Sequence, residues 1–505
     1  MKKEEDMSKI NKKNKAFEIV AIILIILFAI SIATKTLQND TFYTIKVGEL
    51  IVKKHGIDMK EHFSWHDGLK YTYPHWLYDV IIYLIYNISG INGIYISTCM
   101  FAAILGVIFF EVNKKINKNY IMSFFITILA IYMLKDFITA RAQLITYILF
   151  ILQIYYIERL LEKGNKKYGI CLIIISLLMV NLHVAVWPFS FVLYFPYIAE
   201  YIISIIIKGK NDNFKLIINK NKNTKILIFF MVCCIFTGLI TPLRMTPYTY
   251  LINTMRGTTT AWISEHFPII MINNIDVICV LIVILGTLIF TKTRIRLSDL
   301  LMIGGLTILM LYSVRQKSMF VVIGLIVCNR IICDFYKIYN NKLDEILLEE
   351  IVKKWVIFTI ILCFISVDFC LMFEKRKDQL IDSEKYPVEM SEYILEYFKN
   401  TNFSNVRLFN EYNYGSYLLY KGIPVFIDSR ADLYSPEFNK NVIVFDDFMQ
   451  TSILNKDFKE LIEEYKITHI ILKKDSLIYK VMKDMNSDKY KLLNEDDNFI
   501  FYEVL

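Results

Sequence analysis

Three carboxylates lie where long apolar runs of the sequence meet polar segments. Asp40 follows the first apolar run in QNDTFYTIKVGE, Asp79 enters an apolar run in HWLYDVIIYLIY, and Glu265 lies in AWISEHFP between Trp262 and Phe267. A carboxylate in such surroundings is costly unless it is paired or faces a polar cavity. A carboxylate within reach of a bound hydroxyl group can also take its proton. We therefore predict Asp40, Asp79 and Glu265 as candidate catalytic residues.

Each carboxylate also has a simpler interpretation. Asp40 could cap the helix that its own segment predicts, or remain solvated where the apolar run ends. Asp79 could lie at a membrane interface with its carboxylate in water. Glu265 could bind a sugar hydroxyl, a metal or a basic neighbour such as Arg256. The sequence leaves these alternatives open.

Residues that could hold an anion occur in similar positions. ITARAQL contains Arg141, VNLHVAVWP contains His183, and YSVRQKSM contains Arg315 and Lys317. Arginine suits phosphate because its planar fork donates paired hydrogen bonds. We predict that substrate or phosphate is bound by Arg141, His183, Arg315 and Lys317. The cations could instead contact anionic lipid, and the Asn181–His183 pair could join two helices.

Histidine and cysteine do not form a convincing metal motif. His55, His62, His66 and His75 all fall in one polar segment, 38–75, where Asp67-Gly68 predicts a turn rather than a helix. The nine cysteines lie in or beside apolar blocks, and no polar segment carries a pair at metal-ligand spacing. We predict no protein-bound metal from these residues, and leave open a divalent cation as cofactor.

The elements that must position these residues are long apolar helices. The chain has 505 residues, of which 55% are hydrophobic and 15% aromatic. Its apolar blocks reach the roughly 20 residues that a membrane helix needs. The first block lacks a small-residue cleavage site, so we expect it to remain as an anchor. The pattern predicts a polytopic α-helical membrane protein of about 11 spans, near 17–37, 92–112, 120–134, 142–160, 169–187, 189–207, 226–242, 274–291, 299–312, 319–335 and 355–373. Segment 76–89 is apolar but short, and is expected to lie along the surface or to form a partial span.

Charge orients these spans. Basic residues collect at the N-terminus and in alternate loops, near 114–118, 163–167, 208–225, 292–296 and 330–354. The positive-inside rule then places the N-terminus in the cytoplasm, and an odd number of spans places the long loop 38–75 and residues 374–505 outside. We predict a transmembrane domain over 1–373 and an extracytoplasmic domain over 374–505 of a cell-membrane protein. The net charge of +8 reflects these loops and does not predict nucleic-acid binding.

The first long loop and the C-terminal segment have their own patterns. DTFYTIKVGELIVKKHG has helical spacing, with an apolar stripe expected to lie on the membrane surface, and HFSWHDGLKYTYPHWL reads as two extended pieces around a turn. In 374–505, VRLFN, PVFID, THIILKK, YKLLNED and FIFYEV predict strands, and PVEMSEYILEYFKN, SPEFNKNVIVFDDFM and KDFKELIEEYK predict helices. This alternation predicts a small α/β domain.

Asp428 and Arg430 follow the predicted strand PVFI. Ligands bind at the carboxyl ends of strands in open α/β sheets, so both are candidate substrate-binding residues. A local Asp–Arg pair or a turn cap is the alternative.

The order of several motifs is informative. Asp40, Phe42, Tyr43 and Gly48 are followed by FS and WL, then by NLH at 181–183, ISEHFP at 263–268, SVR at 313–315 and FNEYNYGSYLLYKGIPVFIDSRADLY at 409–434. Together they resemble bacterial multi-span proteins of the GT-C glycosyltransferase type, over most of the chain and in the same order. The first loop departs from the pattern Asp-x-Trp-Trp-His, because both tryptophans and the histidine are replaced.

The resemblance implies a GT-C-like membrane domain with a soluble α/β tail, and an enzyme that takes a sugar from a polyprenyl-phosphate carrier on the outer face. Its partners would be membrane lipids, the polyprenyl-phosphate sugar donor and a glycan, lipid or protein acceptor in the cell envelope. The acidic residue of the first external loop corresponds to Asp40, which would act as base or position the acceptor. Arg141 and Arg315 would stabilise the charge of the leaving lipid phosphate.

Two other functions compete with this one. A transporter or flippase of lipid-linked glycans should carry charges within its spans and show internal repeats, whereas these spans are nearly free of charge and no clear repeat occurs. A non-catalytic membrane scaffold stays open because the tryptophans of the first loop are missing.

Overall fold

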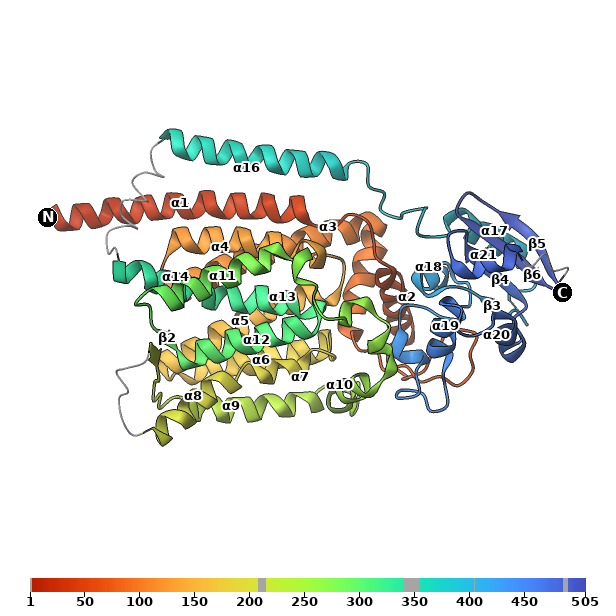
Figure 1. The fold of residues 1–505 in the computed structure, drawn as a ribbon, viewed down its shortest axis with the longest axis horizontal. Coiled ribbons are helices and arrows are strands. Elements are labelled where there is room, and N and C mark those ends of the chain that lie inside the picture. The colour runs from red at the N-terminus through yellow and green to blue at the C-terminus, as the bar shows by residue number, and fades with distance from the viewer. Residues whose placement is uncertain (1, 208–214, 340–353, 404, 485–488) are drawn as a thin grey trace.

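The computed structural model describes residues 2–207, 215–339, 354–403, 405–484 and 489–505. A helix bundle and a C-terminal domain lie end to end along the long axis, and the two chain ends are at opposite ends of the molecule (Figure 1). The basic residues predicted to orient the spans within 208–214 and 340–353 lie outside the described residues.

Helices that run roughly along the long axis form the bundle (Figure 1). Their bounds are α1 Lys2–Ile32, α3 Trp76–Asn117, α4 Tyr120–Met133, α5 Ala142–Lys163, α6 Lys166–Leu182, α7 Trp187–Val192, α8 Phe195–Ile206, α9 Thr224–Phe236, α11 Ile275–Phe290, α12 Leu297–Tyr312, α13 Lys317–Met319, α14 Leu325–Tyr339 and α16 Lys354–Lys375. At the end of the bundle away from the C-terminal domain, strands β1 Leu216–Ile217 and β2 Ile295–Arg296 pair in parallel.

Among the described residues, five helical stretches are long and apolar enough to cross a bilayer, namely Lys15–Ile32, Trp76–Asn117, Ala142–Lys163, Trp187–Ile206 and Val314–Tyr339. Four shorter apolar helices accompany them, for example α4 and α12. A membrane protein is therefore supported, while the span count of about 11 stays a prediction.

Two backbone irregularities interrupt the long helices. Helix α3 is broken at Gly90, whose φ of 61° lies in the left-handed region that glycine tolerates best. Segment 76–89 is therefore a helical piece distinct from the one that follows, and its place along the surface or as a partial span stays a prediction. The second irregularity is a π-helical turn at Phe320–Gly324, between α13 and α14. Such widened turns occur often at functional sites, and this one closely follows Arg315.

The first long loop begins with the predicted helix, α2 Asn39–Lys54. Its apolar stripe was expected to lie on the membrane surface, and this is wrong. Phe42 is fully buried, with its ring centroid 5.0 Å from that of Tyr386 and 5.1 Å from that of Tyr417 in the C-terminal domain. On the other side, α2 approaches α3 so closely that a Cβ on Gly48 would lie 2.1 Å from the Asp79 carbonyl oxygen. Helix α2 therefore lies between the bundle and the C-terminal domain, whose aromatic rings cover its apolar face.

The C-terminal domain is a four-stranded sheet with helices around it. The strands are β3 Leu408–Phe409, β4 His469–Lys473, β5 Tyr490–Glu495 and β6 Phe499–Val504, in the order β3-β4-β6-β5. β3 runs parallel to β4, whereas the β4–β6 and β6–β5 pairs are antiparallel. The helices are α17 Val388–Tyr397, α18 Tyr412–Lys421, α19 Val444–Ser452, α20 Phe458–Tyr465 and α21 Leu477–Asp484.

The predicted strand PVFI is not part of this sheet. Val425 instead pairs with the first loop, where its amide donates to the Phe63 carbonyl at 3.4 Å and its carbonyl accepts from the Trp65 amide at 3.3 Å. Asp428 therefore does not follow a strand of the sheet, so the position of ligands at the carboxyl ends of strands gives Asp428 no binding role. The apolar side chains of the segment are buried: Phe426 and Ile427 are fully buried, and the Phe426 ring packs against Trp65 and His66 of the first loop.

Candidate functional site

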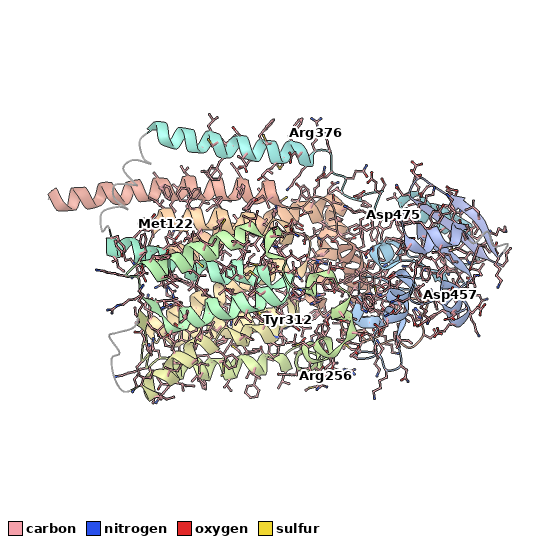
Figure 2. All side chains as sticks on the ribbon, in the orientation of Figure 1. Met122, Arg256, Tyr312, Arg376, Asp457 and Asp475 are labelled. Atoms are coloured by element: carbon pink, nitrogen blue, oxygen red, sulfur yellow. The ribbon has the colours of Figure 1, made fainter. Side chains whose placement is uncertain are left out.

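A cavity of about 510 Å³ lies where the helix bundle meets the C-terminal domain. Figure 2 shows Arg256 and Tyr312 near this end of the bundle, and Met122 towards the opposite end. Helix α10 Thr246–Arg256 and the segment up to His266 form part of the cavity wall. Of the residues predicted from sequence, those that line the cavity are Asp40, Arg141, His183, Glu265, Arg315 and Arg430.

Arg141 connects two of the predicted carboxylates. It is the N-cap residue of α5, with extended backbone, and its side chain lies between α2 and the segment before α11. Its Nη1 donates to Glu265 Oε1 at 2.6 Å, and its Nη2 donates to Asp40 Oδ2. Its Nε is buried and has no hydrogen-bond partner among the described residues.

The charges in this triad support one another. Burial alone would lower the pKa of Arg141, but the Asp40 and Glu265 carboxylates raise it above its ordinary value. Burial likewise acts to raise the pKa of Glu265, and Arg141 and Arg315 outweigh it and hold that pKa below its ordinary value. Arg141 and Glu265 are therefore both ionised at neutral pH.

Arg315 faces the same cavity in a different environment. It lies in the short helix η6 Val314–Gln316, directly before α13. With the Gln143 amide oxygen turned towards it, Arg315 donates from Nε at 3.1 Å and from Nη2 at 2.7 Å. Among the described residues, Arg315 forms no ion pair with a carboxylate. Its charge is therefore available to an anion in the cavity.

Two imidazoles complete this side of the cavity. The rings of His75 and His183 meet edge to face, with centroids 4.9 Å apart. His183 is 1% exposed, and its Nδ1 lies 3.1 Å from the Thr146 hydroxyl. His75 was only one member of a histidine-rich loop in the sequence, and nothing in the spacing linked it to His183.

The C-terminal domain contributes a carboxylate that sequence reasoning missed. Asp432, in the short helix η8 Ala431–Tyr434, lines the cavity and accepts a hydrogen bond from the Tyr250 hydroxyl of α10. Burial raises the pKa of Asp432 above its ordinary value. The only signal for it was its place two residues after Arg430 in the motif SRADLY.

Three predicted residues do not line the cavity. Asp79 is fully buried in the first turn of α3, behind α2, with the Thr44 side chain of α2 beside its carboxylate. Lys317 pairs with Asp276, with Nζ 2.8 Å from Oδ2, and donates to Asn274 Oδ1 at 2.9 Å. Asp428 is also fully buried. These positions give the predicted catalytic or binding roles no support.

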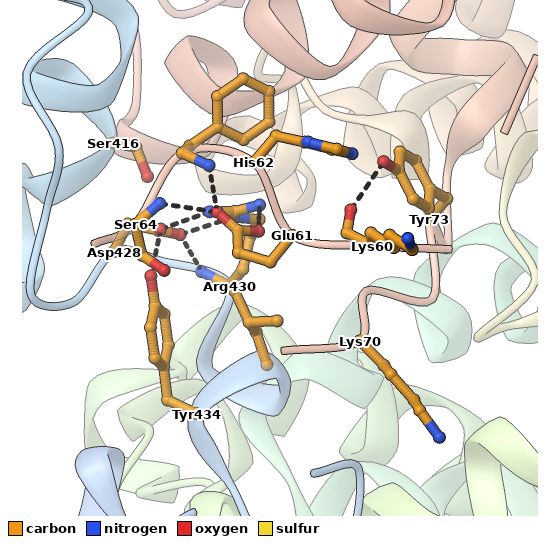
Figure 3. A network of polar contacts seen from close by, with 12 residues as sticks. Lys60, Glu61, His62, Ser64, Lys70, Tyr73, Ser416, Asp428, Arg430 and Tyr434 are labelled. Carbon is orange, nitrogen blue, oxygen red and sulfur yellow. Dashed lines mark hydrogen bonds and ion pairs between the residues drawn. The ribbon is translucent and has the colours of Figure 1, made fainter. Parts of the chain in front are cut away.

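Asp428 and Arg430 instead join the C-terminal domain to the first loop (Figure 3). Arg430 donates from Nε to Asp428 Oδ1 at 2.8 Å and from Nη2 to Asp428 Oδ2 at 2.7 Å. Its Nη1 donates to Glu61 Oε2 at 2.6 Å, and the Tyr434 hydroxyl donates to Asp428 Oδ2 at 2.6 Å. The local Asp–Arg pair left open by the sequence is therefore present, with Glu61 as a third member. We call Glu61, Asp428, Arg430 and Tyr434 the docking cluster.

The chain's fold is similar to that of an archaeal oligosaccharyltransferase. The Archaeoglobus fulgidus oligosaccharyltransferase tethered to an acceptor peptide with the NVT sequon matches with a TM-score of 0.60 and 10% identity, over 97% of this chain and 74% of that chain. The oligosaccharyltransferase AglB of the same organism, in complex with an inhibitory peptide and a dolichol-phosphate, matches with a TM-score of 0.55 and 10% identity, over 91% and 69%. No family model and no curated protein matches the sequence. At 10% identity these likenesses show a shared fold, and that fold is the one expected from the resemblance in the sequence.

Proposed function

We propose that this protein is a membrane glycosyltransferase that moves a sugar from a polyprenyl-phosphate carrier to a cell-envelope acceptor on the outer face. The observation that best supports it is the meeting of Asp40, Arg141, Glu265 and Arg315, from four separate segments, around one cavity at the end of an apolar helix bundle. The two solved structures contain an acceptor peptide in one case, and an inhibitory peptide with a dolichol-phosphate in the other. The shared fold suggests that a lipid-phosphate donor and an acceptor meet in the corresponding cavity here.

The chemistry follows from the two kinds of charge. As an acceptor hydroxyl attacks the sugar, a new carbon–oxygen bond forms, the bond between the sugar and the carrier phosphate breaks, and the hydroxyl loses a proton. Asp40 would take that proton, since a carboxylate at hydrogen-bond distance can act as a general base. Arg315 would stabilise the negative charge that develops on the carrier phosphate, because it lines the cavity and forms no ion pair with a carboxylate in the part of the chain that the structure describes.

The proposal requires the cavity to face outside. Asp40 and Asp432 both line the cavity, and Asp432 belongs to the C-terminal domain. The cavity and that domain must therefore lie on the same side of the membrane. The distribution of lysine and arginine predicts that side to be the outer one.

The first experiment identifies the substrate. Lipid-linked glycans and surface polymers are compared by mass spectrometry in cells with and without the gene. A transferase predicts a donor that accumulates and a surface glycan that loses the corresponding sugar. If the protein is instead a flippase of lipid-linked glycans, cells without the gene should retain the donor on the cytoplasmic leaflet.

The second experiment tests the site with purified protein in nanodiscs. Asp40→Asn keeps the shape of the side chain and removes the base, so transfer should fall by about 100-fold or more. Asp67→Asn is the matched control, because Asp67 is an exposed aspartate of the same loop that does not line the cavity. Well-folded Asp40→Asn protein with normal transfer would move the chemistry to Glu265 or Asp79. Full activity of neutral variants at all three positions would refute the proposed mechanism.

A further inference from the structure

The two cavity carboxylates that could hold a divalent cation are already bridged by a side chain. Asp40 and Glu265 come from segments far apart in the chain, and Arg141 contacts both through different guanidinium nitrogens. One cation therefore lies between two anions. A metal ion shared by the same carboxylates would need the space that the guanidinium fills.

Some other potential metal ligands near the cavity already have partners, whereas the side-chain oxygens of Gln38 and Asn39, which line it, have none among the described residues. The Asn181 side-chain oxygen accepts from Trp76 Nε1 at 3.1 Å, and its nitrogen donates to two backbone carbonyls. His183 Nδ1 lies at hydrogen-bond distance from Thr146, and Asp432 accepts from Tyr250. In the part of the chain that the structure describes, no three His, Cys, Asp or Glu side chains are grouped closely enough to hold a metal. Hard cations such as Mg²⁺ are held by one or two carboxylates together with water, and here the carboxylates of Asp40 and Glu265 are already bound to the Arg141 guanidinium.

Arg141 also retains a donor for a ligand. Its Nη1 and Nη2 are used by the carboxylates, whereas Nε is buried without a partner in a residue that lines the cavity. An unpaired buried donor is costly, and an anionic oxygen of a bound substrate would satisfy it. The guanidinium could thus hold two carboxylates and contact an anion at the same time, which are the two contributions expected of a bound metal.

We infer that the Arg141 guanidinium takes the place of a divalent cation between Asp40 and Glu265, so that this site is built to work without a bound metal. Arg141 is then a positioning residue that fixes both carboxylates and balances their charge. The catalytic consequence rests on the proposed function, whereas the exclusion of a cation from the wild-type site does not.

Manganese binding tests the inference without any assay of transfer. Full-length protein in metal-free nanodiscs is titrated with Mn²⁺ and followed by electron paramagnetic resonance. Wild-type protein should show no Mn²⁺ site that depends on Asp40. Arg141→Met removes the guanidinium and frees both carboxylates, so it should gain about one Mn²⁺ per chain, as expected for a pair of carboxylates with water ligands. That gain should disappear in the double variant Arg141→Met, Asp40→Asn.

Lys421→Met is the matched control, because it removes a cation from an ion pair with the single carboxylate of Glu392 in the C-terminal domain. It should gain no Mn²⁺ site. A wild-type Mn²⁺ site that Asp40→Asn abolishes would overturn the inference. An Arg141→Met protein that gains no Mn²⁺ site would also overturn the inference, because removing the guanidinium would then not free a position that a cation can occupy.

An activity measurement adds the catalytic consequence. If transfer is observed, EDTA should change the wild-type rate by less than about twofold, whereas Arg141→Met should be slow and partly restored by Mn²⁺. Loss of wild-type transfer in EDTA with recovery on added Mn²⁺ would overturn the inference. If no transfer occurs under any condition, the proposed function fails, and the manganese titration still decides the cation question.

Discussion

Replacing Arg430 should loosen the attachment of the C-terminal domain to the first loop. The Arg430 side chain is 2% exposed, and its partners Glu61 and Asp428 are 1% and 0% exposed. Its guanidinium also lies over the rings of Phe63 and Tyr71, at 5.3 and 4.9 Å from their centroids. Arg430→Met fills much of the same volume but leaves two carboxylates buried without a cation.

The expected magnitude follows from this burial. Breaking a buried ion pair by removing one partner costs about 3–5 kcal/mol, because an uncompensated charge remains. A loss of about 4 kcal/mol changes the ratio of attached to detached domain by about 1,000-fold. Lys421→Met is the control, since its partner Glu392 is 64% exposed, and an exposed pair contributes about 1 kcal/mol or less.

Hydrogen exchange of the full-length protein in nanodiscs measures this change. Protection should fall in peptides covering 60–73 and 424–434, which hydrogen-bond to each other across the contact, and it should remain in α5 and α6 of the bundle. Neutralising both carboxylates together with Arg430, as Glu61→Gln, Asp428→Asn and Arg430→Met, should restore much of the protection. Protection of Arg430→Met within about threefold of wild type would refute the reasoning, as would a triple variant no better protected than the single one.

Three further predictions concern other parts of the molecule. Arg315→Lys should slow transfer and Arg315→Gln should slow it by about 100-fold, measured at limiting lipid donor, because the paired donors to the phosphate are lost; full activity of Arg315→Gln would remove its assigned role. Burial raises the pKa of Glu411 to about 7 in the C-terminal domain, so the folded state binds a proton that the unfolded chain releases above its own pKa near 4.5. The contribution of Glu411 to stability should therefore be present in full below that value and be lost as the pH rises to about 7, and Glu411→Gln should remove this part of the pH dependence of thermal unfolding. An exposed cysteine at Lys440→Cys should react with an impermeant maleimide in intact cells, with wild type as the background control; labelling only after lysis would reverse the predicted topology.

Local patterns in the sequence predicted much of the secondary structure. Strands β4, β5 and β6 and helices α17 and α20 follow from alternating or helical periodicity that their own residues carry. The short strand β3 and the segment PVFI were harder to tell apart as members of the sheet, because both are buried apolar runs. Which of them joins the sheet depends on whether its partner is β4 or the first loop, and that choice involves residues far away in the sequence.

The site was predictable where a charged residue is unusual for its surroundings. Asp40, Arg141, Glu265 and Arg315 stand at the ends of apolar runs, and the structure brings all four to one cavity. Asp79 and Lys317 give the same signal, yet their side chains lie behind the cavity wall or pair with Asp276. The sequence does not specify the direction of a side chain or its distant partner. Asp432 was missed for the same reason, because its hydrogen-bond donor Tyr250 is 182 residues away in the sequence.

The docking cluster has a consequence for how the protein is made. Glu61 and Arg430 are separated by 369 residues, so the ribosome releases the first loop long before its partner exists. During that interval Glu61 cannot pair with the Arg430 guanidinium. The hydrogen bonds of Val425 with Phe63 and Trp65 cannot form either, because Val425 has not been synthesised. Domains assemble from the N-terminus as synthesis proceeds, and the cavity wall is completed only when residues 424–434 have been synthesised and have folded onto the first loop. A truncated chain would therefore insert its helices but display an unfinished first loop, which quality-control proteases could recognise.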